Sequence, residues 1–247
     1  THPDPAKRVV RAATNAKKYP ASTVRNADAH FKAIDGMMYD DDPKEGVIEG
    51  QEFLHPDLRL RFAVPNGFGM SNGTQAVTIS GNGGKALFTT QPYNGDRKAY
   101  IDAAFKAVVG DKQQVSYGAI KNPTVNGISA FYASADVPTQ QSGTVTLMVF
   151  AYEWAPNQAF HFVTITPVNA MPFASMFESV TRMTDRQASD IKPRKVRVAT
   201  VGRSDTVATM AAQMAYKNFQ TERFLALNGL SANATLSRGQ KVKIVTY

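Results

Sequence analysis

The stretch VTLMVFAYEW, residues 145–154, is the part of the sequence that decides the fold. A strand with one face in water alternates apolar and polar residues, whereas both alternating sets of this stretch are largely apolar. The pattern predicts a central β-strand that is covered on both faces. Helices are the expected cover, and apolar spacing indicates two of them, at residues 96–109 and 171–183. Phe150, Tyr152 and Trp154 are interpreted as core, with stacking on a sugar or base as the alternative.

Shorter strand-like runs surround this strand and are separated by turn signals. They lie at residues 58–64, 76–80, 85–90, 115–120, 128–135 and 160–166. The segment Gly81-Asn82-Gly83-Gly84 joins two of the runs, and we interpret it as a hairpin turn. We therefore expect residues 52–185 to form an α+β domain, in which helices pack on an antiparallel sheet.

The amino-terminal segment, residues 1–51, predicts two helices. Asp4-Pro5 begins the first, since a proline in the first helical turn loses no hydrogen bond. Ser22 or Thr23 is expected to cap the second. The apolar residues of this second helix recur at helical spacing and are expected to be buried; they are Val24, Ala27, Phe31, Ile34 and Met38.

The carboxyl-terminal segment, residues 186–247, predicts the order strand, helix, helix, strand. Ser204 or Asp205 is expected to cap its first helix and Thr221 its second, which Asn228-Gly229 ends. A closing strand is expected over residues 236–245. The chain thus divides into three expected units, 1–51, 52–185 and 186–247.

The net charge of +8 is concentrated in the last of these units. Residues 186–247 hold 11 Lys and Arg against 3 Asp and Glu, whereas residues 1–51 hold 8 against 8 and residues 52–185 hold 9 against 9. Such asymmetry suggests contact with an anionic surface, with a merely soluble basic face as the alternative. No apolar run reaches the roughly 18 residues of a membrane span, so no transmembrane segment is expected.

The residues that carry metal or hydrolytic chemistry do not form a known pattern. The chain has no cysteine, and its four histidines form no HExxH motif. His55 and His161 are interpreted as structural. The acidic cluster, Asp40, Asp41, Asp42, Glu45 and Glu49, lacks the ligand spacing of a calcium loop and is interpreted as a solvated helix end. We expect no catalytic residue, metal site or cofactor in this chain.

The first residues, Thr1-His2-Pro3 with Arg8-Val9, resemble the T-H-P-x-x-x-x-R-[VIL] segment that follows the catalytic helices of HtpX- and BepA-like zinc metallopeptidases. Residues 33–39 and 50–58 resemble the region after the protease domain in cell-envelope relatives. The resemblance implies the carboxyl-terminal, non-catalytic region of a periplasmic zinc metalloendopeptidase, whose zinc lies in the parent's protease domain. It also implies that His2 neighbours that zinc cleft and that Arg8 lies on the helix behind it.

Residues 202–207, 224–230 and 236–244 resemble, in the right order, the G-D-T turn, second helix and closing strand of a LysM module. The resemblance implies binding of N-acetylglucosamine glycan, as in peptidoglycan. The implied contact residues are Ser204, Asp205, Thr206, Asn228 and Leu230. Two extra residues separate the glycine from the aspartate in the glycan-contacting loop, which leaves docking as the alternative use. The segment from Phe62 to Phe68 resembles the sandwich of PsbP and Mog-type proteins.

These observations favour an accessory, regulatory or substrate-positioning region of an envelope metalloendopeptidase, with a stand-alone peptidoglycan-binding protein as the alternative. The expected partners are the parent's own protease domain and an anionic envelope component. Nucleic acid is not expected, because the sequence shows no RNP-like or helix-turn-helix signature.

Overall fold

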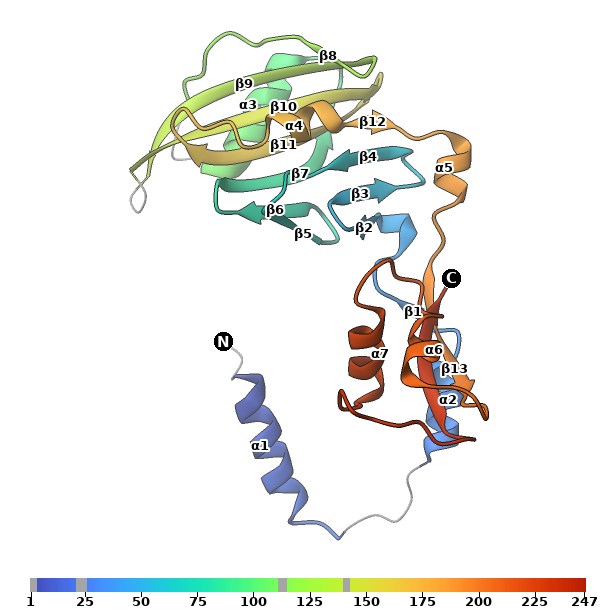
Figure 1. Ribbon diagram of the computed structural model, residues 1–247. Helices are drawn as coiled ribbons and strands as arrows, with labels where there is room; N and C mark the ends of the chain where they lie inside the picture. Colours follow the sequence, from blue (N-terminus) through green and yellow to red (C-terminus); the bar gives the residue numbers. More distant parts are fainter. Residues whose placement is uncertain (1–3, 21–25, 111–114, 140–142) are drawn as a thin grey trace. The chain divides into compact units, whose positions relative to one another are not determined.

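The computed structural model describes residues 4–20, 26–110, 115–139 and 143–247 (Figure 1). The chain forms two compact units, and the first of them is built from two separate segments. We call it the basic unit; it comprises residues 1–37 and 195–246, while the second, the sheet unit, comprises residues 38–194 and Tyr247. The expected division at residues 51 and 185 stays a prediction. Within the described ranges, no helix combines the length and apolar character that a membrane span requires.

A seven-stranded antiparallel sheet forms the centre of the sheet unit. Its strands, in spatial order, are β5 (Phe68–Asn72), β6 (Val77–Gly81), β7 (Gly84–Pro92), β11 (Gln158–Pro167), β10 (Gly143–Ala155), β9 (Ile128–Thr139) and β8 (Thr124–Val125). The sheet curls strongly in Figure 1. Strand β10 contains the stretch 145–154, and its Phe150 lies opposite Phe162 of β11 and Tyr132 of β9. The mixed α+β class with an antiparallel sheet is therefore confirmed.

The central sheet is covered by a helix on one face and by a second sheet on the other. Helix α3 (Arg97–Val109) packs on the first face, where Tyr100 lies 5.8 Å from the ring of Phe131. A four-stranded sheet and helix α4 (Ala174–Ser179) cover the second face, where the Phe62 ring lies 5.0 Å from that of Phe162. The strand order of this four-stranded sheet is β12 (Thr181–Arg182), β4 (Leu60–Ala63), β3 (Glu52–His55) and β2 (Val47–Glu49).

Strand β10 is thus buried on both faces as predicted. Helices contribute to the cover of both faces, but the second face is covered mainly by a sheet that was not predicted, with α4 beside it. The helix expected at 171–183 is only α4, because Thr181 leaves the helical path to pair with Arg61 of β4. The run 115–120 forms no strand; Tyr117 instead stacks on Phe105 of α3 at 5.3 Å. Three short elements complete the unit, β1 (Met38–Tyr39), η1 (Pro43–Glu45) and α5 (Asp185–Ser189).

The hairpin predicted at residues 81–84 and the helix predicted at residues 96–109 are both present in the sheet unit. Gly81 pairs with Gly84 across the two-residue turn Asn82-Gly83, so this segment is a hairpin turn. The side chain of Asp96 accepts a hydrogen bond from the backbone N–H of Ala99 at 3.0 Å, which caps the amino terminus of α3.

In its described residues, the basic unit contains the antiparallel strands β13 and β14 and four helices. In chain order these are α1 (Pro5–Ala16), α2 (Ala27–Ile34), β13 (Arg194–Thr200), α6 (Val207–Ala211), α7 (Gln220–Asn228) and β14 (Lys241–Thr246). Val196 of β13 lies opposite Val245 of β14, and both are buried with Met210, Met214 and Phe224. A β-α-α-β order is therefore present in the described residues from 194 to 246.

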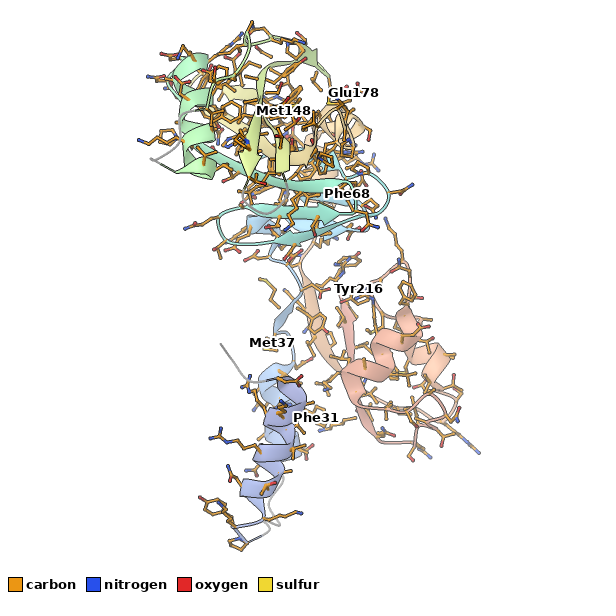
Figure 2. The ribbon with its side chains drawn as sticks, turned by 90° about the vertical axis from the view of Figure 1, so that its left-hand side faces the viewer. Phe31, Met37, Phe68, Met148, Glu178 and Tyr216 are labelled. Carbon is orange, nitrogen blue, oxygen red and sulfur yellow. The ribbon has the colours of Figure 1, made fainter. Side chains whose placement is uncertain are left out.

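Helix α2 joins this β-α-α-β segment through polar contacts more than through a buried face. Phe31, labelled in Figure 2, and Ile34 are only half-buried, and Ala27 and Met38 are exposed, so the expected burial of this face was wrong. Lys241 Nζ bonds Asp28 Oδ1 at 2.6 Å, and the backbone N–H of Val198 donates to Asp35 Oδ1 at 3.0 Å. The expected caps Ser22 and Thr23, and also Val24, lie outside the described residues, and the cap position is taken by Asn26.

Candidate functional site

The five residues predicted to contact glycan lie in two loops of the basic unit. Ser204, Asp205 and Thr206 precede α6, while Asn228 ends α7 and Leu230 follows it. Asp205 does not cap the helix, because its Oδ2 accepts the backbone N–H of Gly202 at 2.7 Å and so closes the loop. Thr206 is the cap, in a reciprocal pair with Thr209. The prediction that Ser204 or Asp205 caps α6 was therefore wrong by one or two positions.

The side chain of Asn228 is committed to the fold. Its Nδ2 donates to the carbonyl oxygens of Phe224 at 2.9 Å and Lys243 at 2.8 Å, and its Oδ1 accepts the Lys243 N–H at 2.7 Å. The next residue, Gly229, ends α7 in the left-handed conformation, as predicted. Phe219 rather than the expected Thr221 precedes the helix at the cap position. Asn228 thus ties α7 to β14 and is not a free glycan ligand.

Replacing Asn228 by alanine is expected to lower the stability of the basic unit by about 2 kcal/mol, because it leaves backbone groups of Lys243 without partners. Amide hydrogen exchange on β14 measures the change, with the exposed Ser204→Ala as control. Unchanged protection of β14 in the Asn228 variant would contradict this role. Loss of glycan binding in such a variant therefore reports folding and does not identify a groove.

The residues that remain for recognition in these loops are Ser204, which is exposed, and Leu230, which is half-buried. The Leu230 backbone N–H already donates to the Leu225 carbonyl at 2.9 Å, so only its side chain is available. The structure therefore narrows the predicted set of five side chains to two.

Of the two residues that the resemblance assigns to the surroundings of a zinc cleft, the structure describes one. His2 lies outside the described residues. Arg8 is exposed on α1, where every side chain that the structure describes is exposed. In the described part of the chain, no three His, Asp or Glu side chains come together as a metal site would need.

Two histidines that were interpreted as structural lie in the sheet unit. His161 on β11 is 2% exposed, and its Nδ1 lies 2.9 Å from the hydroxyl of Tyr100, which also donates to the Ala159 carbonyl at 3.0 Å. Burial lowers the pKa of His161 to about 4, so its ring is neutral at pH 7. His55 is half-buried, and burial lowers its pKa as well.

The acidic cluster is more ordered than the predicted solvated helix end. Asp42 Oδ1 accepts the Lys44 N–H at 3.0 Å at the start of η1, and Asp41 Oδ2 accepts the Ile48 N–H at 3.0 Å. Glu49 pairs with Arg194 at 2.7 Å. Asp41 and Asp42 are half-buried. These carboxylates fix the backbone that leads into β2. The interpretation of the cluster as a solvated helix end was therefore wrong.

A polar cluster that sequence reasoning missed is centred on Glu153. Arg97 holds both carboxylate oxygens, at 3.0 and 2.7 Å, while Tyr93 and Ser129 donate to the same group. The bonds from Arg97 lower the pKa of Glu153 to about 2. The cluster joins α3 to β9 and β10, so it has a structural role. No motif spacing signals it, because its members come from separate elements.

The sheet unit also has a cavity of about 250 Å³ that sequence reasoning missed. Its floor consists of the buried side chains of Phe53, Val77, Phe88 and Phe160, and its walls include those of His55 and Leu58. The segment 72–76 and the turn at Lys44 and Glu45 form its rim. These residues span more than a hundred positions and come from five strands, β3, β5, β6, β7 and β11.

Charge is divided sharply between the two units. The basic unit contains 15 Lys and Arg against 5 Asp and Glu, whereas the sheet unit contains 13 against 15. The surface cations of the β-α-α-β segment are Arg197, Arg203, Lys217, Arg223, Arg238 and Lys241, all of them exposed. The basic excess of the sequence therefore belongs to one compact body.

Comparisons with known proteins give little beyond this geometry. No protein-family model matches the chain, and no curated protein matches it in sequence. Among solved structures, the chain is similar to the solution structure of cyanobacterial PsbP (CyanoP) from Synechocystis sp. PCC 6803, at 12% identity. That match covers 56% of this chain and 98% of the other, with a TM-score of 0.39. A likeness at that level carries no argument about function.

Proposed function

We propose that this chain is an accessory, substrate-positioning region of a periplasmic zinc metalloendopeptidase, and that its basic unit binds an anionic polymer of the cell envelope. The observation that carries the proposal is the confinement of the net positive charge to the basic unit, which holds 15 cations against 5 acids. A compact body of one sign concentrates counter-charged polymer at its surface. The sheet unit, which carries 13 cations against 15 acids, has no such attraction.

The envelope setting rests on the resemblances in the sequence. The T-H-P segment supports attachment to an upstream protease domain, which would be the chain's first partner and would hold the zinc. The β-α-α-β order of residues 194–246 supports a LysM-like module, and the curled sheet supports a PsbP or Mog-type sandwich. Together they support a region that holds a protease near its substrates.

Sedimentation with purified peptidoglycan sacculi tests the polymer contact. The double variant R203E/R238E is expected to lose binding at least about tenfold, because each change reverses one exposed cation of the basic unit. The control K85E/R186E makes the same change of net charge on the sheet unit. Wild-type binding is expected to weaken as salt rises, since exposed charges are screened beyond about 8 Å at physiological ionic strength. Equal loss in both double variants would contradict the assignment to the basic unit.

The accessory role has a separate test in the purified chain. We expect neither stoichiometric zinc nor cleavage of casein. Elemental analysis measures the zinc content of the purified chain, and a casein assay measures its proteolytic activity. Zinc-dependent turnover by this chain alone would overturn the accessory role.

Glycan binding by the LysM-like loops is the second candidate, and the β-α-α-β order favours it. An uncharged N-acetylglucosamine tetramer is the proper probe, because charge alone does not bind it. Heteronuclear NMR is expected to show salt-resistant shifts at Ser204 and Leu230, and a Leu230→Ala variant is expected to bind more weakly. Shifts confined to surface cations and abolished by salt would eliminate the groove.

A further inference from the structure

The cavity of the sheet unit has a floor of aromatic rings that are fixed by their neighbours. The rings of Phe53 and Phe88 lie 6.2 Å apart, and those of Phe88 and Phe160 stack at 5.9 Å. Gly46 adopts a φ of +91°, and a side chain there would overlap the Phe53 ring. Only glycine therefore lets Phe53 take its place in the floor.

The rim of the cavity is also held in place. The Asn72 side chain donates to the carbonyl oxygen of Gly46 at 2.8 Å, which ties the end of β5 to the start of β2. The Thr89 hydroxyl donates to the Gln75 carbonyl at 3.0 Å, and the Gly73 N–H donates to the Ala76 carbonyl at 3.0 Å. The opening is therefore preformed, as ligand cavities usually are.

His55 supplies one oriented donor in this apolar setting. Its Nδ1 accepts the Leu58 N–H at 3.4 Å, so the neutral ring carries its proton on Nε2. The ring lies edge-on to Phe53, with centroids 6.4 Å apart. Lys44 and Glu45 on the rim have opposite charges, so the opening favours neither sign.

The volume and chemistry together define the group that fits. A dry cavity of about 150 Å³ in another protein holds benzene. The cavity here, about 250 Å³, has room for such a ring and an adjoining amide. We propose that it binds one aromatic side chain of a polypeptide, with the ring against Phe53, Phe88 and Phe160 and an amide carbonyl accepting from His55 Nε2. This gives the proposed substrate-positioning role a site, and rests on that role only for the origin of the peptide.

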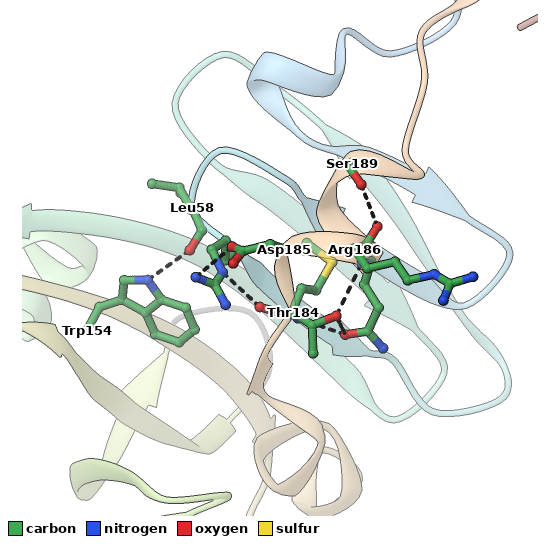
Figure 3. A network of polar contacts seen from close by, with 9 residues as sticks. Leu58, Trp154, Thr184, Asp185, Arg186 and Ser189 are labelled. Atoms are coloured by element: carbon green, nitrogen blue, oxygen red, sulfur yellow. Dashed lines mark hydrogen bonds and ion pairs between the residues drawn. The ribbon is translucent and has the colours of Figure 1, made fainter.

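The single tryptophan of the chain reports on this cavity directly. Trp154 packs against Phe160, with ring centroids 5.9 Å apart, and its indole N–H donates to the Leu58 carbonyl at 3.0 Å. Figure 3 shows the indole directed at that carbonyl. Both Phe160 and Leu58 line the cavity. A ligand that moves either residue therefore changes the fluorescence of Trp154.

Titration of the whole chain with N-acetyl-phenylalaninamide, followed by Trp154 fluorescence, tests the proposal. We expect a saturable change, matched by NMR shifts of the His55 ring. Ala76→Leu narrows the half-exposed rim and is expected to weaken binding about tenfold or more. The matched control is Ala174→Leu, an exposed site on α4 outside the cavity. Absence of saturation and of His55 shifts in the wild type would overturn the proposal.

His55→Phe separates the hydrogen bond from the apolar floor. This variant is expected to bind the amide about fivefold to tenfold more weakly, while toluene, which has no acceptor, is expected to bind equally well to both proteins. Equal weakening for both probes would overturn the His55 contact. Because neither probe is charged or a glycan, failure here is distinguishable from failure of polymer binding by the basic unit.

Discussion

Replacing Phe162 by alanine is expected to destabilise the sheet unit by about 3–5 kcal/mol, the usual cost of deleting a buried aromatic ring. Phe162 on β11 is 0% exposed. Its ring contacts rings of the second sheet and of α4, which cover the same face, and rings within the central sheet, namely Phe62, Phe177, Phe88 and Tyr152. Because strands and helix hold these neighbours, the space that remains does not collapse, and the lost contacts are not replaced.

Urea unfolding followed by Trp154 fluorescence measures this effect, since Trp154 belongs to the same unit. Ile165→Ala on the same strand is the matched control. Ile165 lies on the opposite face of β11 and is 38% exposed, so its loss is expected to cost less than about 1 kcal/mol. Similar midpoints for the two variants would show that the second sheet does not pack on β11 as described.

Acidification is expected to weaken the sheet unit through His161. In the unfolded chain this histidine titrates near 6.5, whereas burial lowers its pKa in the fold to about 4. The unfolded state therefore binds the proton first, and folding stability falls as the pH falls. The contribution is complete above about pH 6.5, and about 3 kcal/mol is lost by about pH 4.

His161→Phe removes this titration and leaves the Tyr100 hydroxyl its bond to the Ala159 carbonyl. The carboxylates still titrate in the variant as they do in the wild type. The difference between the two proteins therefore isolates the titration of His161. Unfolding free energies measured by Trp154 fluorescence between pH 7.5 and 4.5 are expected to fall less steeply in the variant than in the wild type. Parallel curves would mean that His161 accepts its proton in the folded state as readily as in water.

The elements that could be predicted from the sequence are those with a strong local pattern. The doubly apolar run of β10, the glycine hairpin at 81–84 and helix α3 all follow from residues within a short window. Of the second sheet, only β4 was predicted, as part of the run 58–64, because β2, β3 and β12 have two to four residues each and show too little periodicity. Pairing of Thr181 with Arg61 then shortened the helix expected at 171–183.

For the residues predicted to contact glycan, the sequence indicated their positions in the fold but not the bonds that their side chains make. The sequence placed Asp205 and Asn228 in the two loops correctly, yet only the bonds to Gly202 and Lys243 show that their side chains close those loops. The cavity was not predictable, since His55, Phe88 and Phe160 meet only through the strand order of two sheets. Spacing along a chain says nothing about such convergence.

The basic unit is assembled from segments far apart in the chain, and this has a consequence for biosynthesis. Asp28 and its partner Lys241 are 213 residues apart, and the Gly36 N–H donates to the carbonyl of Val196, which is also made much later. On the ribosome, helix α2 therefore emerges long before its partners exist. By the time those partners are made, every strand of the sheet unit has been made. The sheet unit can fold first, and the basic unit is completed last, once translation has passed β14.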